Sequence, residues 1–207
     1  KNRDREANWR SACNTGVVGL SLASVVETSR RVAATSKRLE KTELLARLLK
    51  EARGEEIEVL VSFLSGETRQ GRTGIGYATF RDANVSPAAA PTVELLAVDR
   101  TLTAIAEVKG AGSEGRRRDQ LQALLALATA DEQKYLRELF LGGLRQGALE
   151  GIVLDALART SGISLDRIRR AVMLAGDISR VARALLESGE SAIAEYSIRL
   201  FRPVHPM

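Results

Sequence analysis

Several residue types are scarce in this sequence, and each scarcity excludes a class of protein. The 207 residues contain one cysteine, Cys13, so an internal disulfide is excluded and a reducing, cytoplasmic environment is expected. The single histidine, His205, excludes a histidine-based catalytic triad and a multi-histidine metal site. No stretch approaches 18 uninterrupted apolar residues, so we expect neither a membrane span nor a membrane partner.

Aromatic residues are also few, at 4% of the chain, although apolar residues together make up 44%. Leucine, alanine, valine and isoleucine dominate the apolar set, which favours helices packed on helices. The length is sufficient for one domain with a sizeable core. A net charge of +5 fits a nucleic-acid partner without requiring one.

Apolar residues recur at spacings of three and four almost everywhere after residue 20, and sustained alternation is rare. This periodicity predicts an all-α fold of about ten to twelve helices. Thr129 and Glu132 have the spacing of a capping box, which predicts a helix start at residue 130. The predicted helices span residues 21–34, 38–52, 55–64, 73–82, 93–108, 114–128, 130–141, 148–160, 165–174 and 178–188, with a short one at 190–196.

Two segments lack this periodicity. Residues 1–20 are expected to be a poorly ordered or non-native leader. Residues 83–91 contain both internal prolines and should connect two halves, at about 21–83 and 92–196.

The two halves nearly repeat one sequence. Each copy runs from a small polar residue through a basic cluster and a leucine-rich helix to a glycine-flanked Arg-Gln-Gly turn. This pattern predicts an internally duplicated, pseudo-two-fold domain with two equivalent grips on a repetitive partner such as a phosphate chain. The pairs spaced by 77 residues are Ser36/Ser113, Leu44/Leu121, Leu48/Leu125, Leu64/Leu141 and Gly66/Gly143, and the Arg-Gln-Gly triplets are residues 69–71 and 145–147.

Basic residues stand at the start of one predicted helix in each copy, where the helix dipole disfavours them. A bound phosphate would remove this cost, because it accepts hydrogen bonds from the free backbone N–H groups and neutralises the side chains. A solvated basic helix start is the alternative interpretation at either site alone. The residues concerned are Ser36, Lys37, Arg38 and Lys41 in the first copy, and Ser113, Arg116, Arg117 and Arg118 in the second.

The glycine-rich turns support the same hypothesis, since backbone without side chains can approach a sugar-phosphate chain closely. The alternative is that these glycines simply permit tight turns. The full set of candidate DNA-binding residues is Ser36, Lys37, Arg38, Arg69, Gln70, Gly71, Arg72, Gly74, Gly76, Ser113, Arg116, Arg117, Arg145, Gln146 and Gly147.

A different kind of DNA contact is suggested by residues 158–170. Ala158, Gly162 and Ile168 have the spacing of a helix-turn-helix, which would place Arg167 and Arg169 on a recognition helix. Many plain helix pairs share this spacing.

Several blocks together resemble the N-terminal DNA-binding domain of ATP-dependent DNA ligases. The resemblance runs from about residue 21 to the end of the chain. The blocks are TSKRLEK at 35–41, LSGETRQGRTGIG at 64–76, GAGS at 110–113, LRQGALEG at 144–151, MLAGD at 173–177 and RPVHPM at 202–207.

The resemblance implies an all-helical domain at 21–202 that grips the minor groove on both sides of a nick, largely without reading sequence. It also implies that residues 203–207 begin a linker to a nucleotidyltransferase domain, whose K-x-D-G lysine motif does not occur in this chain. The chain alone should therefore bind double-stranded or nicked DNA, as a monomer, without catalytic residues or a cofactor. ATP, Mg²⁺ and the downstream catalytic domains belong to the full-length parent, which seals nicks in replication, repair or recombination.

Two other functions fit the sequence. A transcription regulator would use the helix-turn-helix at 158–170 to read one operator. A helical protein-interaction scaffold would carry basic faces that are merely solvated.

Overall fold

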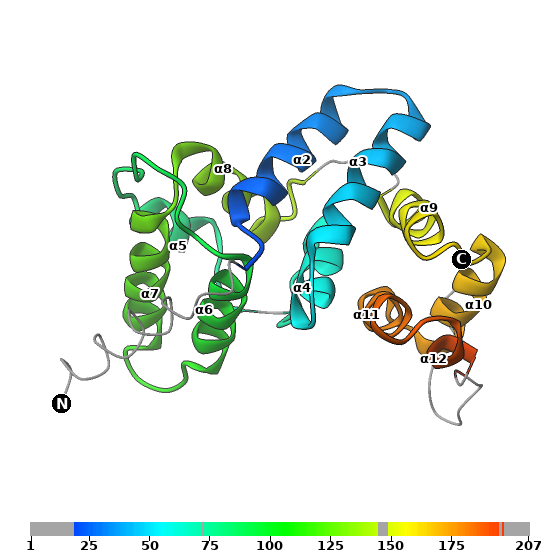
Figure 1. The fold of residues 1–207 in the computed structure, drawn as a ribbon. Coiled ribbons are helices and arrows are strands. Elements are labelled where there is room, and N and C mark those ends of the chain that lie inside the picture. The colour runs from blue at the N-terminus through cyan, green and yellow to red at the C-terminus, as the bar shows by residue number, and fades with distance from the viewer. Residues whose placement is uncertain (1–18, 72, 145–148, 195, 197–207) are drawn as a thin grey trace.

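The computed structural model describes residues 19–71, 73–144, 149–194 and 196, and this part of the chain is all-α (Figure 1). It contains eleven helices and no strands, as the periodicity predicts. None of these helices is long and apolar enough to cross a membrane. The helices are α2 (Leu22–Ala34), α3 (Arg38–Glu51), α4 (Glu55–Leu64), α5 (Tyr77–Asp82), α6 (Leu95–Glu107), α7 (Ser113–Leu127), α8 (Ala130–Phe140), α9 (Leu149–Ser161), α10 (Leu165–Ala175), α11 (Ile178–Ser188) and α12 (Glu190–Ala194).

Two helices begin two or more residues later than predicted. The helix predicted from residue 73 starts at Tyr77, because Gly74 has a φ of 73°, outside the range of a right-handed helix. The helix predicted from residue 93 starts at Leu95. Val93 instead accepts a backbone hydrogen bond of 2.8 Å from Leu22, beside an isolated antiparallel bridge between Ser21 and Glu94.

The predicted leader extends too far into the folded part. Leu20 is buried, and its N–H donates to Glu56 Oε1 at 2.7 Å. Its carbonyl accepts from the N–H of Leu95 at 2.8 Å. Residues 19 and 20 therefore belong to the domain, whereas residues 1–18, with Cys13, lie outside the described residues, as does His205.

The helices form three groups that lie side by side in Figure 1. Helices α2, α3 and α4 run through the middle, with α5 to α8 on one side and α9 to α12 on the other. Helix α3 packs against α9, and α4 packs against both α6 and α11. The first helices in the sequence therefore lie between the two later groups.

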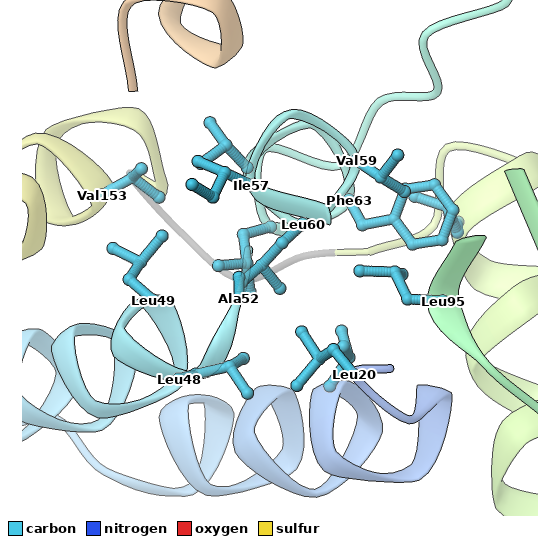
Figure 2. Packing of buried hydrophobic residues seen from close by; sticks show 14 of the residues in the cluster. Leu20, Leu48, Leu49, Ala52, Ile57, Val59, Leu60, Phe63, Leu95 and Val153 are labelled. Carbon is cyan, nitrogen blue, oxygen red and sulfur yellow. The ribbon is translucent and has the colours of Figure 1, made fainter. Parts of the chain in front are cut away.

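Helix α4 forms the centre of the hydrophobic core. Its residues Ile57, Val59, Leu60 and Phe63 are almost completely buried and point towards several neighbouring elements (Figure 2). Around them lie Leu49 of α3, Val153 of α9 and Leu95 of α6. A helix whose apolar residues face several directions is stable only when other elements cover those faces.

The connector between the halves is non-helical, as predicted. No helix lies between Asp82 and Leu95, in residues that the structure describes throughout. The segment is nevertheless fixed to the fold, because Ala83 is fully buried and the N–H of Ala88 donates to the carbonyl of Ala128 at 2.9 Å.

The predicted capping box at the start of α8 is confirmed. Thr129 Oγ1 accepts from the N–H of Glu132 at 3.4 Å, and Glu132 Oε2 accepts from the N–H of Thr129 at 2.7 Å. The Glu132 side chain is buried, and its Oε2 also accepts from Thr129 Oγ1 at 2.8 Å, whereas its Oε1 has no hydrogen-bond partner among the described residues.

We expect Thr129→Ala to lower the free energy of unfolding by about 1 kcal/mol, because it removes the side-chain acceptor at the helix start. Urea denaturation followed by circular dichroism measures this loss. Ser164→Ala is the matched control, since Ser164 is the N-cap of α10 and makes no side-chain capping bond. Equal losses in the two variants would contradict the assignment.

Candidate nucleic-acid interface

The start of α7 combines an uncapped helix end with a cluster of arginines. The N-cap is Gly112, in the left-handed conformation with a φ of 71°, and it offers no side chain to the first-turn N–H groups. The predicted helix start is therefore corrected by one position, since Ser113 is the first helical residue rather than the residue before it. Glu114 is the acidic residue in this first turn. The N–H of Ser113 donates to the carbonyl of Gly110 at 3.1 Å, so the N–H groups of Glu114 and Gly115 are the ones available for an anion.

Two of the α7 arginines bind the loop that precedes their own helix. Arg116 Nη2 donates to the carbonyl of Lys109 at 2.6 Å, and Arg117 Nη2 donates to the carbonyl of Val108 at 2.6 Å. Both acceptors are neutral, so these bonds leave the positive charges uncancelled. The arginines thus hold the loop in place and still contribute a positive potential.

Arg117 also contacts the glycine-rich segment of the first copy. A Cβ atom on Gly74 would lie 3.0 Å from Arg117 Nη1, so a side chain at this position would displace the guanidinium. Gly74 is therefore required both for its φ of 73° and for this close approach. The contact brings residues 73–76 beside the start of α7, and helices α5 and α7 pack together there.

The start of α3 lies against α9. Arg38 Nη2 pairs with Asp155 Oδ2 of α9 at 2.7 Å, and it lies 3.8 Å from where a Gly151 Cβ would be. Ser36 and Lys37 are exposed, and the N-cap residue Lys37 makes no side-chain capping bond. Leu39, in the same turn, is 75% exposed.

The Arg-Gln-Gly turn of the first copy is predicted to bind phosphate. In the structure, its arginine and glutamine side chains are bound to other residues of the protein. Arg69 binds the carboxylates of Asp99 and Glu58, with Nη1 at 3.2 Å from Glu58 Oε2 and Nη2 in contact with Asp99 Oδ2. Gln70 Nε2 donates to Asp99 Oδ1 at 2.9 Å and to Thr103 Oγ1 at 2.9 Å. Both side chains are thus anchored inside the protein, whereas Gly71 is exposed with open space around it.

The carboxylates also affect the titration of this arginine. The hydrogen bond to Asp99 raises the pKa of the Arg69 guanidinium, against the opposing effect of burial. Arg69 therefore stays charged, and its charge is balanced within the protein.

Asp99 is a residue that the sequence reasoning missed. It is 4% exposed and occupies the buried stripe of α6 together with Leu95, Val98 and Leu102. A carboxylate at such a position needs a charged or hydrogen-bonding partner. The sequence did contain an indication of this role, because Asp99 is one acidic residue on the apolar face of a predicted helix.

A polar cleft of about 640 Å³ opens beside this turn. It lies between the C-terminal end of α4, the turn itself and the start of α11. Asp177 already caps α11, accepting from the N–H groups of Ser179 at 2.9 Å and Arg180 at 3.2 Å, so this helix start differs from the uncapped starts of α3 and α7.

The remaining candidates are placed as follows. Gly76 is the N-cap of α5 and is exposed. Arg72, Arg145, Gln146 and Gly147 lie outside the described residues. The second Arg-Gln-Gly turn therefore stays a prediction.

The helix-turn-helix candidate has the expected backbone. Helix α9 ends at Ser161, Gly162 turns with a φ of 75°, and α10 begins at Leu165. Arg167 pairs with Glu190 of α12, and Arg169 lies 3.7 Å from Asp166. The geometry is compatible with a helix that recognises DNA bases and equally with two packed helices that do not contact DNA.

Known proteins similar to this chain are DNA ligases. A probable DNA ligase of Streptomyces griseus is 46% identical over 90% of this chain. A probable DNA ligase of Anaeromyxobacter is 45% identical over 91% of the chain, and one of Rhodococcus opacus is 43% identical over 89%. The chain spans only 36–37% of the length of these relatives.

The family comparison agrees with these relatives. Residues 75–158 match the family described as the DNA ligase N terminus. The matched region contains α5 to α8 and most of α9, and therefore includes the arginine cluster at the start of α7. Residues 75–158 thus form a DNA ligase N-terminal domain, and the relatives that match about nine tenths of the chain are probable DNA ligases.

Proposed function

We propose that this chain is the DNA-binding module of an ATP-dependent DNA ligase. It grips the phosphate backbone of duplex or nicked DNA through the minor groove, without reading sequence, during nick sealing in replication, repair or recombination. In the parent enzyme, downstream domains with ATP and Mg²⁺ carry out the sealing. The chain alone binds DNA as a cytoplasmic, nucleoid-associated monomer and does not ligate.

The observation that carries this proposal is the start of α7. Gly112 leaves the first-turn N–H groups without a side-chain cap. Arg116 and Arg117 donate hydrogen bonds to neutral backbone carbonyls, so these bonds do not neutralise their charges. Backbone donors and uncancelled cations at one point favour a phosphate oxygen over a neutral ligand. They do not favour one base over another, because phosphate contacts carry no sequence information.

The packing of the two copies supports a second, equivalent grip. Helix α7 packs against α5 and places Arg117 beside Gly74, while α3 packs against α9 and places Arg38 beside Gly151. The two glycines are 77 residues apart, one more than the spacing of 76 between the neighbouring Arg-Gln-Gly triplets, so they lie in similar but not identical positions of the repeat. We therefore propose a pseudo-two-fold domain in which the basic helix start of each copy is held by the glycine-rich segment of the other.

The second candidate function is a transcription regulator that reads an operator with α10. The observation in its favour is the tight turn at Gly162 between α9 and α10. Its arginines differ from those of α7, since Arg167 and Arg169 both face carboxylates. This pairing reduces their ability to bind phosphate or a guanine edge.

The double variant Lys37→Ala/Arg116→Ala should bind nicked duplex more weakly than the parent chain. If each residue contacts one phosphate, the slope of log K against log salt should become shallower by about 0.9 for each contact removed. Fluorescence anisotropy over a salt series measures this slope. The control is Arg167→Ala/Arg169→Ala, which removes two charges from α10, and an unchanged slope in the first variant would contradict the proposal.

Selection from random duplexes separates the two candidate functions. Phosphate binding should enrich no consensus, because backbone contacts are equivalent in all sequences. A regulator should enrich one sharp site that is lost in Arg167→Ala. Sequencing of the bound fraction therefore decides between them, and a consensus of this kind would overturn the ligase-module proposal.

A further inference from the structure

A chain of alternating charges connects the first Arg-Gln-Gly turn to three helices. Asp99 of α6 binds Arg69, and Arg69 also binds Glu58 of α4. Glu58 in turn lies 3.2 Å from Arg183 of α11, whose Nε is 3.1 Å from Glu187. The turn is thus tied to α4, α6 and α11 by one network.

Asp99 is the most buried member of this network. Its side chain is 5% exposed, compared with 26% for Arg69 and 20% for Glu58. Removing one partner of such a buried pair leaves an uncompensated charge, so the two groups must stay together. Because Asp99 sits within the rigid stripe of α6, it is Arg69 that is held in place by Asp99.

Gln70 extends the same attachment. Besides the Asp99 carboxylate, its Nε2 lies 3.2 Å from the backbone carbonyl of Asp99 and 2.9 Å from Thr103 Oγ1. The turn contributes a backbone bond of its own, from the N–H of Gly71 to the carbonyl of Thr68 at 3.1 Å. Side-chain bonds to α6 therefore carry most of the anchoring of residues 69–71.

This turn leads directly into the glycine-rich segment beside Arg117. Gly71 is the first exposed glycine of the block, and Gly74 is the one in contact with the start of α7. Helix α6 holds both ends of this arrangement, since Asp99 anchors the turn and Val108, just after α6, binds Arg117. The positions of residues 71 and 73–76 therefore depend on α6.

We infer that Asp99 is a positioning residue of the DNA interface, and that Arg69 serves as its internal partner rather than as a phosphate contact. Asp99 holds Arg69 and Gln70 and thereby fixes the glycine-rich backbone that meets DNA. This inference rests on the proposed DNA binding. It reverses the role expected for Arg69 from the sequence.

The variant Asp99→Asn distinguishes the two roles by the sign of its effect. If Asp99 positions the turn, its loss weakens nicked-DNA binding by roughly tenfold, as expected when a charged partner is removed from a network, and the salt slope stays unchanged. If Arg69 instead contacts a phosphate and Asp99 competes with that phosphate for it, Asp99→Asn should bind nicked DNA more tightly. The slope of log K against log salt should then be steeper. Tighter or unchanged binding would overturn the inference.

Arg69→Lys provides a second, independent variant. Lysine keeps the charge but lacks the planar fork that reaches Asp99 and Glu58 together. A positioning role predicts that lysine fails to restore binding and matches Asp99→Asn. A lysine variant with the affinity of the parent chain would contradict the inference, because a phosphate contact tolerates this change.

Glu132→Gln controls for loss of stability alone. Glu132 is also a buried carboxylate, 1% exposed, but it caps α8 and has no contact with the turn. It should lower the melting temperature while leaving the DNA affinity at 10–15 °C below that melting temperature unchanged. A loss of affinity equal to that of Asp99→Asn would show that destabilisation explains both and would overturn the inference.

Amide hydrogen exchange tests the positioning without DNA. In Asp99→Asn the amides of residues 66–71 and 73–76 should exchange more than tenfold faster, with α2 and α8 unchanged. Absence of this local change would overturn the inference even if DNA binding is confirmed. Failure of the parent chain to bind DNA would instead remove the proposed function, and the exchange result would still report on Asp99.

Discussion

The burial of the apolar residues of α4 is the constraint on which the rest of the structure depends. Its residues Ile57, Leu60 and Phe63 point in different directions, so no single neighbour can cover them. Coverage needs α6, α9 and α11, which come from widely separated parts of the sequence. Burying a side chain of this size is worth roughly 1.5–3 kcal/mol, and the sum over α4 is large compared with the stability of a domain. The same requirement brings the two later groups of helices to opposite sides of α2 to α4.

The packing of the helices also determines which arginines are paired with carboxylates. Where helices meet, arginines bind carboxylates, as Arg69 does with Asp99 and Arg38 with Asp155. At the start of α7, Arg116 and Arg117 bind neutral carbonyls and keep their charge for another partner, whereas Arg118 pairs with Asp119. A basic residue near a glycine-rich turn can therefore support the fold or serve a ligand. The distinction depends on whether its nearest acceptor is charged.

Much of the fold could be predicted from the sequence, because it depends on local patterns. The starts of α3 and α4 and the capping box at Thr129 follow from periodicity and from groups within one turn of each other. The errors occurred where distant contacts override local preference. Residues 93 and 94 pair with residues 21 and 22 instead of continuing α6 backwards, and the buried Leu20 lay in a segment without any period. The ion pair between Arg69 and Asp99 could not be predicted, because the two residues are 30 positions apart in the sequence.

The sequence by itself determined that the chain is helical, that it has two similar basic segments, and that it resembles the DNA ligase N-terminal domain. These properties reside in residue types and in spacings along one chain. The tertiary structure decided which side chains remain available to a partner. Asp99 binds Arg69 and Gln70, and Gly74 makes room for Arg117, only because α6 lies beside both segments. Such assignments require distances between residues that are far apart in sequence, and packing around the buried α4 alone sets those distances.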